Sequence, residues 1–121
     1  MHMDSQDLAR RIARLALAKK AEDILILDVR QFSVGTDFFL ICSGNSDTHV
    51  RAVADEIVET MKHEEERVWH VEGYSTARWV LLDYVNVVAH VFHHETRSYF
   101  GLDLLWGDAP SERLEETEGR G

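Results

Sequence analysis

The sequence is poor in cysteine, proline and basic residues, and these shortages exclude several classes of protein. A single cysteine, Cys42, allows no internal disulfide, which favours a reducing, cytoplasmic compartment. Lys and Arg number 13 against 22 Asp and Glu, so the formal net charge is −9. This balance argues against direct binding to a nucleic-acid backbone, which usually requires a basic surface. It suits a basic protein partner, because complementary charge speeds and orients the encounter.

Long apolar segments are missing as well. No apolar run reaches the roughly 18 residues that would span a bilayer, which predicts no membrane contact. The length of 121 residues and the hydrophobic fraction of 45% are those of one globular domain, which is predicted over residues 5–110. Residues 1–4, which include a second methionine, Met3, are interpreted as a tag remnant or disordered start. After Pro110, the only proline, residues 111–121 are interpreted as an acidic, disordered tail.

Hydrophobic periodicity divides the predicted domain into helices and strands. Apolar residues recur at helical spacing over residues 8–16 and 50–61. Apolar runs and alternating patterns predict five strands, at 24–29, 37–43, 68–71, 79–84 and 87–92. A short helical turn is predicted within 96–106. The order α-β-β-α-β-β-β-α indicates an α/β (α+β) fold, with a mixed five-stranded sheet and helices mainly on one face.

Alternation along the last two predicted strands decides which side chains share a face. One face of the first strand carries Trp79, Leu81 and Asp83. The other face carries Val80, Leu82 and Tyr84. Where no helix covers such a face, an exposed aromatic and apolar patch usually marks a protein contact. The pattern leaves open whether Trp79 and Tyr84 belong to a contact surface or to the core.

Metal-binding and catalytic motifs are weak. His90, His93 and His94 are close in sequence, but neighbouring strand residues point to opposite faces, and one cysteine disfavours a closed zinc site. Nucleotidyl transfer needs two carboxylates on one strand face to hold Mg²⁺, yet Val85 stands two positions after Asp83. Phosphate-loop fingerprints and a serine nucleophile elbow are also missing. The sequence therefore predicts no catalytic residue, no metal and no cofactor.

Three segments, in a fixed order and spacing, carry a family resemblance over roughly residues 8–110. The first runs from Asp37 to Ala52 and includes Gly44-Asn45-Ser46-Asp47-Thr48. The second comprises Glu72-Gly73 and Trp79-Val80-Leu81-Leu82-Asp83-Tyr84. The third comprises Val88-Ala89-His90-Val91-Phe92-His93, Glu95-Thr96-Arg97 and Leu105-Trp106-Gly107-Asp108-Ala109-Pro110. On these segments the chain resembles the ribosomal silencing factor family, also known as Iojap-like, RsfS or YbeB.

The resemblance implies a nucleotidyltransferase-like fold without the catalytic carboxylates, and a protein that is not an enzyme. It implies binding to the large ribosomal subunit at the ribosomal protein numbered fourteen, which sterically blocks joining of the small subunit and represses translation. A homodimer is implied for the free protein, and nucleic acid is not its main contact.

The resemblance also implies a contact surface, within which our hypothesis assigns Trp79, Leu81 and Tyr84 as apolar anchors and Asp83 as a partner for a basic group. The implied surface consists of ten residues: Trp79, Leu81, Asp83, Tyr84, His90, Phe92, His93, Arg97, Tyr99 and Phe100.

Two departures from the family pattern stand out. The family commonly has Gly-Asp where this chain has Val85-Asn86, and a tight primed turn would require a positive φ at Val85. Because that conformation is unfavourable for a β-branched residue, another turn type is expected. Gly101 also replaces a commoner acidic residue.

Three alternatives to the silencing role stay open. One is a nucleotide-binding or nucleotidyltransferase-like enzyme on the same fold, in which the turn Gly44-Asn45-Ser46 could offer N–H groups to a phosphate. The others are a large-subunit assembly factor and a generic dimeric adaptor.

Overall fold

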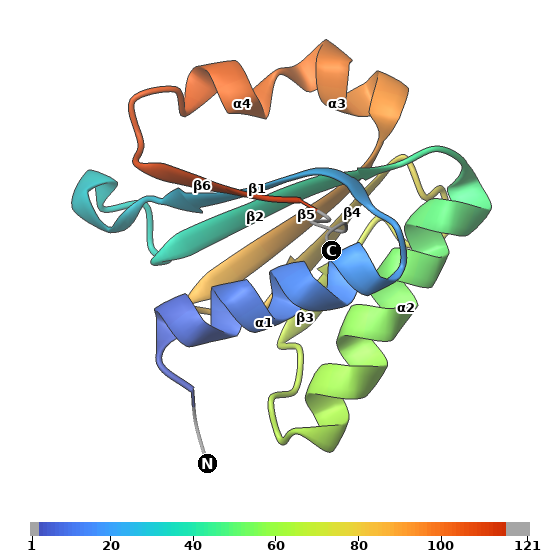
Figure 1. Cartoon of the computed structure of the whole chain (residues 1–121), viewed down its shortest axis with the longest axis horizontal. Helices are drawn as coiled ribbons and strands as arrows, with labels where there is room; N and C mark the ends of the chain where they lie inside the picture. The colour runs from blue at the N-terminus through green and yellow to red at the C-terminus, as the bar shows by residue number, and fades with distance from the viewer. Residues whose placement is uncertain (1–2, 116–121) are drawn as a thin grey trace.

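A single mixed sheet lies between two layers of helices in the computed structural model, which describes residues 3–115 (Figure 1). The six strands are β1 (Glu22–Asp28), β2 (Phe38–Gly44), β3 (His70–Glu72), β4 (Trp79–Asp83), β5 (Val87–His93) and β6 (Ser111–Leu114). The helices are α1 (Ser5–Ala18), α2 (Asp47–His63), α3 (His94–Phe100) and α4 (Leu102–Leu105), with a 3₁₀ turn at Arg30–Phe32. The predicted α/β class is confirmed, and every predicted strand is found within one or two residues of its expected bounds.

The sheet order is β3-β4-β5-β2-β1-β6, with β2 and β5 parallel and all other neighbours antiparallel. β2 and β5 are buried along almost their whole length, as strands with helices on both faces must be. Their apolar runs explain this position, because a strand that is apolar on both sides is stable only at the centre of a sheet. The parallel pair could not be read from the sequence, since it joins segments about 50 residues apart.

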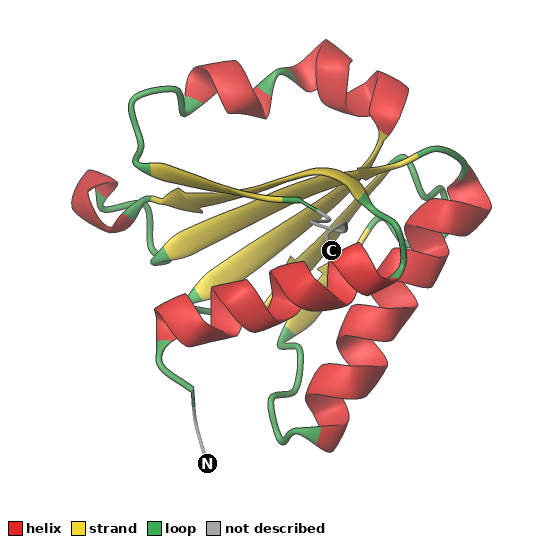
Figure 2. Cartoon of the chain, in the orientation of Figure 1, coloured by secondary structure: helices red, strands yellow, loops and turns green. Residues whose placement is uncertain are grey.

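The two long helices pack together on one face of the sheet (Figure 2). The carboxylate of Asp4 accepts a hydrogen bond from the Asp7 N–H at 2.8 Å and begins α1, while the Ser46 hydroxyl accepts from His49 N–H at 3.0 Å and begins α2. Their apolar stripes meet strand side chains such as Leu40 and Val80 in the main core. Each such fully buried aliphatic side chain contributes about 1.5–3 kcal/mol to folding.

The two short helices, α3 and α4, lie on the opposite face, above the sheet in Figure 1. Leu102 and Trp106 from this segment pack on a second core that includes Leu25, Ile41 and Phe92. This smaller layer covers β1, β2 and part of β5. The expectation of helices mainly on one face therefore holds for the long helices, and the other face is half covered.

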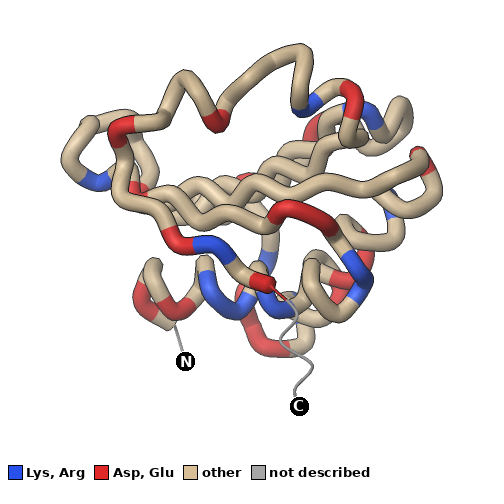
Figure 3. Tube along the Cα trace, turned by 45° about the horizontal axis from the view of Figure 1, so that its top comes forward, with Lys and Arg blue, Asp and Glu red and all other residues tan. Residues whose placement is uncertain are grey.

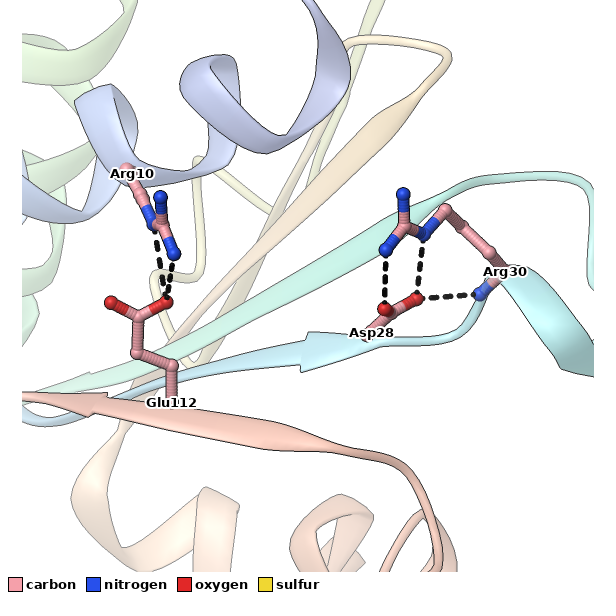
Figure 4. A network of polar contacts seen from close by, with 4 residues as sticks. All are labelled: Arg10, Asp28, Arg30 and Glu112. Atoms are coloured by element: carbon pink, nitrogen blue, oxygen red, sulfur yellow. Dashed lines mark hydrogen bonds and ion pairs between the residues drawn. The ribbon is translucent and has the colours of Figure 1, made fainter.

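The expected boundaries of the ordered domain differ from those of the structure. β6 lies inside the segment predicted to be a disordered tail and pairs with β1, so the sheet has six strands rather than five. Pairing satisfies backbone groups that the edge of β1 would otherwise leave open, and Arg10 of α1 binds Glu112 of β6 at 3.1 Å (Figure 4). At the start of the chain, Met3 packs against the core. The rest of the predicted tail, 116–121, and residues 1–2 lie outside the described residues.

The β4–β5 hairpin uses a turn other than a primed turn, as expected, but Val85 still has the positive φ that its side chain disfavours. Val85 adopts a positive φ of 76°, although its β-branched side chain disfavours it. The Asn86 N–H donates to the Tyr84 carbonyl at 2.9 Å, which closes a three-residue γ-turn around Val85. The Asp83 carboxylate accepts from the Val85 N–H at 2.8 Å. The local hydrogen bond that the Asp83 carboxylate accepts thus helps to hold a strained turn in place.

Candidate protein-binding surface

The uncovered part of the upper sheet face lies over β3 and β4, beside the end of α3. Five of the ten predicted contact residues are at least partly exposed there, and we refer to them together as the docking strip: Trp79, Leu81, Asp83, Tyr99 and Phe100. Trp79 and Leu81 line a shallow hollow together with Glu72 and Gly73. Tyr99 is 83% exposed and Phe100 50% exposed. Sheet and helix therefore contribute neighbouring apolar side chains to one surface.

Within the docking strip, the Trp79 side chain is fixed by ring packing and by a hydrogen bond. Its ring packs against Phe92 of β5 and against Phe100 of α3, with a centroid distance of 4.8 Å in both cases. Its indole N–H donates to Nδ1 of His90 at 3.1 Å. Aromatic pairs at this spacing add about 0.5–1.5 kcal/mol beyond area burial. The ring is thus presented to a partner in a fixed orientation, which reduces the entropy lost on binding.

His90 lies beneath the docking strip and is not a charged contact. It is 6% exposed, and burial lowers the pKa of its imidazole to about 4. The neutral ring uses Nδ1 as an acceptor for Trp79, so its proton is assigned to Nε2. Nε2 has no hydrogen-bond partner among the described residues, and the Phe39 ring stands edge-on to the imidazole at 5.2 Å. His90 therefore supports Trp79 from below.

The structure buries five of the ten predicted contact residues, so these side chains do not reach a partner in this conformation. They are Tyr84, His90, Phe92, His93 and Arg97. Strand alternation turns Tyr84 to the face covered by α1 and α2, where it joins the main core, and Phe92 is buried in the second core with Leu102 and Trp106. The ambiguity over Trp79 and Tyr84 is thereby resolved: Trp79 is on the open face and Tyr84 is in the core.

His93 and Arg97 have structural partners instead of surface positions. His93 is the N-cap of α3, where its Nδ1 accepts from the Glu95 N–H at 3.3 Å. The Arg97 guanidinium binds the Asp103 carboxylate of α4, at 2.8 Å for the shortest contact. This hydrogen bond lowers the pKa of Asp103 below its ordinary value. Both residues thus shape the segment that carries Tyr99 and Phe100.

One carboxylate, that of Glu72, borders the docking strip on its β3 side, and a second, that of Asp83, belongs to the strip itself. Register places Glu72 opposite Leu81, and His70 opposite Asp83, so these four side chains share one face. His70 and Glu72 contact each other at 2.8 Å. Acidic residues elsewhere are spread over both helical layers rather than gathered in one cluster (Figure 3). An apolar centre with carboxylates at its edge fits a partner surface that is apolar and basic.

Two exposed leucines were missed by sequence reasoning. Leu104 and Leu105 of α4 are 88% and 71% exposed, next to the docking strip along the chain. The sequence predicted only a helical turn in this region, without assigning its faces. Leu102 packs against the second core, whereas Leu104 and Leu105 are largely exposed to solvent. Two adjacent leucines in so short a helix were the available signal.

The described part of the chain shows neither a metal centre nor a membrane span. Within residues 3–115, no three His, Cys, Asp or Glu side chains come together in a group that could hold a metal ion. In the same residues, no helix has the length and apolar character needed to cross a membrane.

Comparison with known proteins identifies the family. The family model described as "Ribosomal silencing factor during starvation" matches residues 2–120. The chain belongs to this family. The protein described as "Ribosomal silencing factor RsfS" from Bacillus subtilis is 45% identical over 113 residues, covering 93% of this chain and 96% of that protein. The protein of the same description from Halalkalibacterium halodurans is 42% identical, covering 93% of this chain and 97% of that protein.

A solved structure supports the same assignment. The crystal structure of a Bacillus halodurans protein superposes with a TM-score of 0.79 at 39% identity, covering 90% of this chain and 99% of that one. The family resemblance read from the sequence is confirmed, and the fold is shared with relatives of the ribosomal silencing factor family. The names of these relatives describe a regulatory role rather than an enzymatic one.

Proposed function

We propose that this chain represses translation by binding the large ribosomal subunit at the ribosomal protein numbered fourteen, which sterically blocks joining of the small subunit. The observation that carries the proposal is the docking strip, with Trp79 held in a fixed orientation on an uncovered sheet face. Family membership supports the ribosome as the target. The proposed place of action is the cytoplasm, and catalysis has no part in the mechanism.

The chemistry of the docking strip suits a ribosomal protein. Trp and Tyr are the residues that most often dominate protein interfaces, and Trp79 and Tyr99 are both accessible. Asp83 and Glu72 lie at the edge, where charge steers the encounter more than it adds affinity. Proteins that lie on RNA carry basic surfaces, which the net charge of −9 complements. A nanomolar complex requires about 12 kcal/mol, well within reach of one interface of ordinary size.

The decisive experiment is a pull-down with separated large subunits and with the isolated ribosomal protein numbered fourteen. We expect the wild-type chain to capture both, and Trp79→Ala to weaken capture by at least about tenfold while circular dichroism stays unchanged. Trp69→Ala is the matched control, because Trp69 is 71% exposed but lies outside the docking strip. No capture of either target by the wild-type chain would refute the proposal.

Two further measurements separate this proposal from its competitors. Calorimetric titration with a nucleoside triphosphate and Mg²⁺ should show no binding, whereas micromolar binding would favour a nucleotide-dependent enzyme. Sedimentation of the free chain should show a homodimer, which we propose for the ribosome-free state. The outward-facing leucines of α4 are available for such a contact, and a monomer at all concentrations would exclude it.

A further inference from the structure

Arg97 is a buried cation whose hydrogen bonds join four separate elements of the fold. It is 9% exposed. Its Nη1 donates to the Asp23 carbonyl of β1 at 2.7 Å and to the Ser43 hydroxyl of β2 at 2.9 Å. Its Nε and Nη2 donate to the two carboxylate oxygens of Asp103 in α4, at 3.2 and 2.8 Å. A guanidinium satisfied on several sides at once is a directional link that no other side chain reproduces.

The backbone on both sides is arranged to meet this guanidinium. Asp23 has a positive φ of 51°, at the point where the β1–β2 register shifts between Glu22 and Leu25. On the helix side, Gly101 has a φ of 62° and its N–H donates to the Arg97 carbonyl at 2.9 Å. The sharp reversal at Gly101 brings Asp103 back beside Arg97. Unusual backbone conformations on two elements therefore converge on one side chain.

The link determines where α3 stands relative to β4. Phe100 is three residues after Arg97, almost one turn further along α3, and its ring packs on Trp79 with a centroid distance of 4.8 Å. α3 has only seven residues, too few to be stable without tertiary contacts. The hydrogen bonds of Arg97 to β1 and β2 therefore control the position of Phe100. Through the contact between Phe100 and Trp79, they also control how the Trp79 ring is presented at the surface.

We infer that Arg97 is a positioning residue for ribosome binding: it touches no partner, but it fixes α3 so that Phe100 and Trp79 form one continuous surface. The inference rests on the proposed function of the docking strip. It assigns a role to Arg97 that differs from the direct contact implied by the family resemblance.

The first test needs no ribosome. In isotope-labelled protein, Arg97→Met should shift or broaden the indole N–H resonance of Trp79 and leave that of Trp69 in place. Arg10→Met is the matched control. It also removes an arginine–carboxylate pair, the one with Glu112, but that pair joins α1 to β6, away from α3 (Figure 4). Arg97→Lys keeps the positive charge but loses the planar guanidinium with its several N–H donors. It should shift the Trp79 indole N–H resonance less than Arg97→Met does. An unchanged Trp79 resonance in Arg97→Met would overturn the inference whether or not the chain binds ribosomes.

The second test is a double-mutant cycle on binding to large subunits, at a temperature where circular dichroism shows every variant folded. Arg97→Met and Phe100→Ala should each weaken binding by about tenfold, and the double variant should be little weaker than Phe100→Ala alone, because both act through one contact. Independent, multiplying losses would overturn the positioning role, as would wild-type affinity in Arg97→Met. If the wild-type chain does not bind, the proposed function fails, and the resonance of Trp79 still decides the role of Arg97.

Discussion

The indole N–H of Trp79 and Nδ1 of His90 are 3.1 Å apart on neighbouring antiparallel strands. This hydrogen bond ties a partly exposed aromatic residue to a buried neutral histidine. It explains how the docking strip keeps a large apolar ring at the surface without leaving it free to rotate. It also makes the support of that ring sensitive to the protonation of His90.

Acid should destabilise the fold through His90. Because burial lowers the folded-state pKa of His90 to about 4 from its ordinary value of 6.5, the unfolded chain binds more protons between these two pH values. The stabilisation is complete above the unfolded pKa and is lost as pH falls toward 4, by roughly 3 kcal/mol. Urea unfolding at pH 7 and pH 4.5 measures the loss. His90→Gln should show a smaller acid-dependent loss, and the exposed His63→Gln should behave like wild type; equal pH dependence in all three would contradict this account.

Tyr84 should contribute to the core and not to binding. Its hydroxyl is buried without a hydrogen-bond partner among the described residues, so Tyr84→Phe should leave stability unchanged or raise it by up to about 1 kcal/mol. Tyr84→Ala should lower the free energy of unfolding by about 3–5 kcal/mol. Chemical denaturation gives both values. A loss of ribosome binding in folded Tyr84→Phe would restore Tyr84 as a contact residue.

Val85→Gly should stabilise the protein. The φ of 76° at Val85 strains a β-branched residue, while glycine adopts it freely. Removing the backbone strain at residue 85 should stabilise the fold by about 1–2 kcal/mol. Glycine also gives the unfolded chain more conformational entropy, so the free energy of unfolding should rise by a net of about 0.5–1 kcal/mol. Thermal unfolding measures this gain as a rise in Tm. The companion variant Asp83→Ala removes the acceptor for the Val85 N–H and should lower Tm; a lower Tm for Val85→Gly would show that the turn is not strained.

Gly73→Ala should be far more damaging than Gly101→Ala, although both glycines have a positive φ. A Cβ at Gly73 would stand 2.0 Å from the Trp79 carbonyl oxygen, whereas a Cβ at Gly101 meets nothing within 4 Å. The second substitution costs only backbone strain, about 1 kcal/mol. The first also forces β3 and β4 apart, and we expect a loss above about 3 kcal/mol or failure to fold. Similar unfolding free energies for the two variants would show that the loop before β4 yields easily.

Sequence periodicity predicts the elements well because each depends on local spacing. The alternation from Trp79 to Asp83, the apolar stripe of α2 and the cap at Ser46 are all visible within a few residues of chain. β6 was missed because its four residues, Ser111–Leu114, are mostly polar and form a strand only through pairing with β1. The positive φ of Val85 was missed because the hydrogen bonds of the hairpin outweigh the preference of a single residue.

In the candidate site, too, some features follow from local sequence patterns and others depend on tertiary contacts. By itself the sequence determined the family, the fold class, and the fact that Trp79 and Tyr84 point to opposite faces, since these follow from motif spacing and from the two-residue period of a strand. Only the tertiary structure decided which of those faces is open, because α3 and α4 fold back over one half of the sheet and not the other. It also turned Arg97 from an expected surface contact into a buried link, since its four acceptors come from segments as far apart in the chain as Asp23 and Asp103.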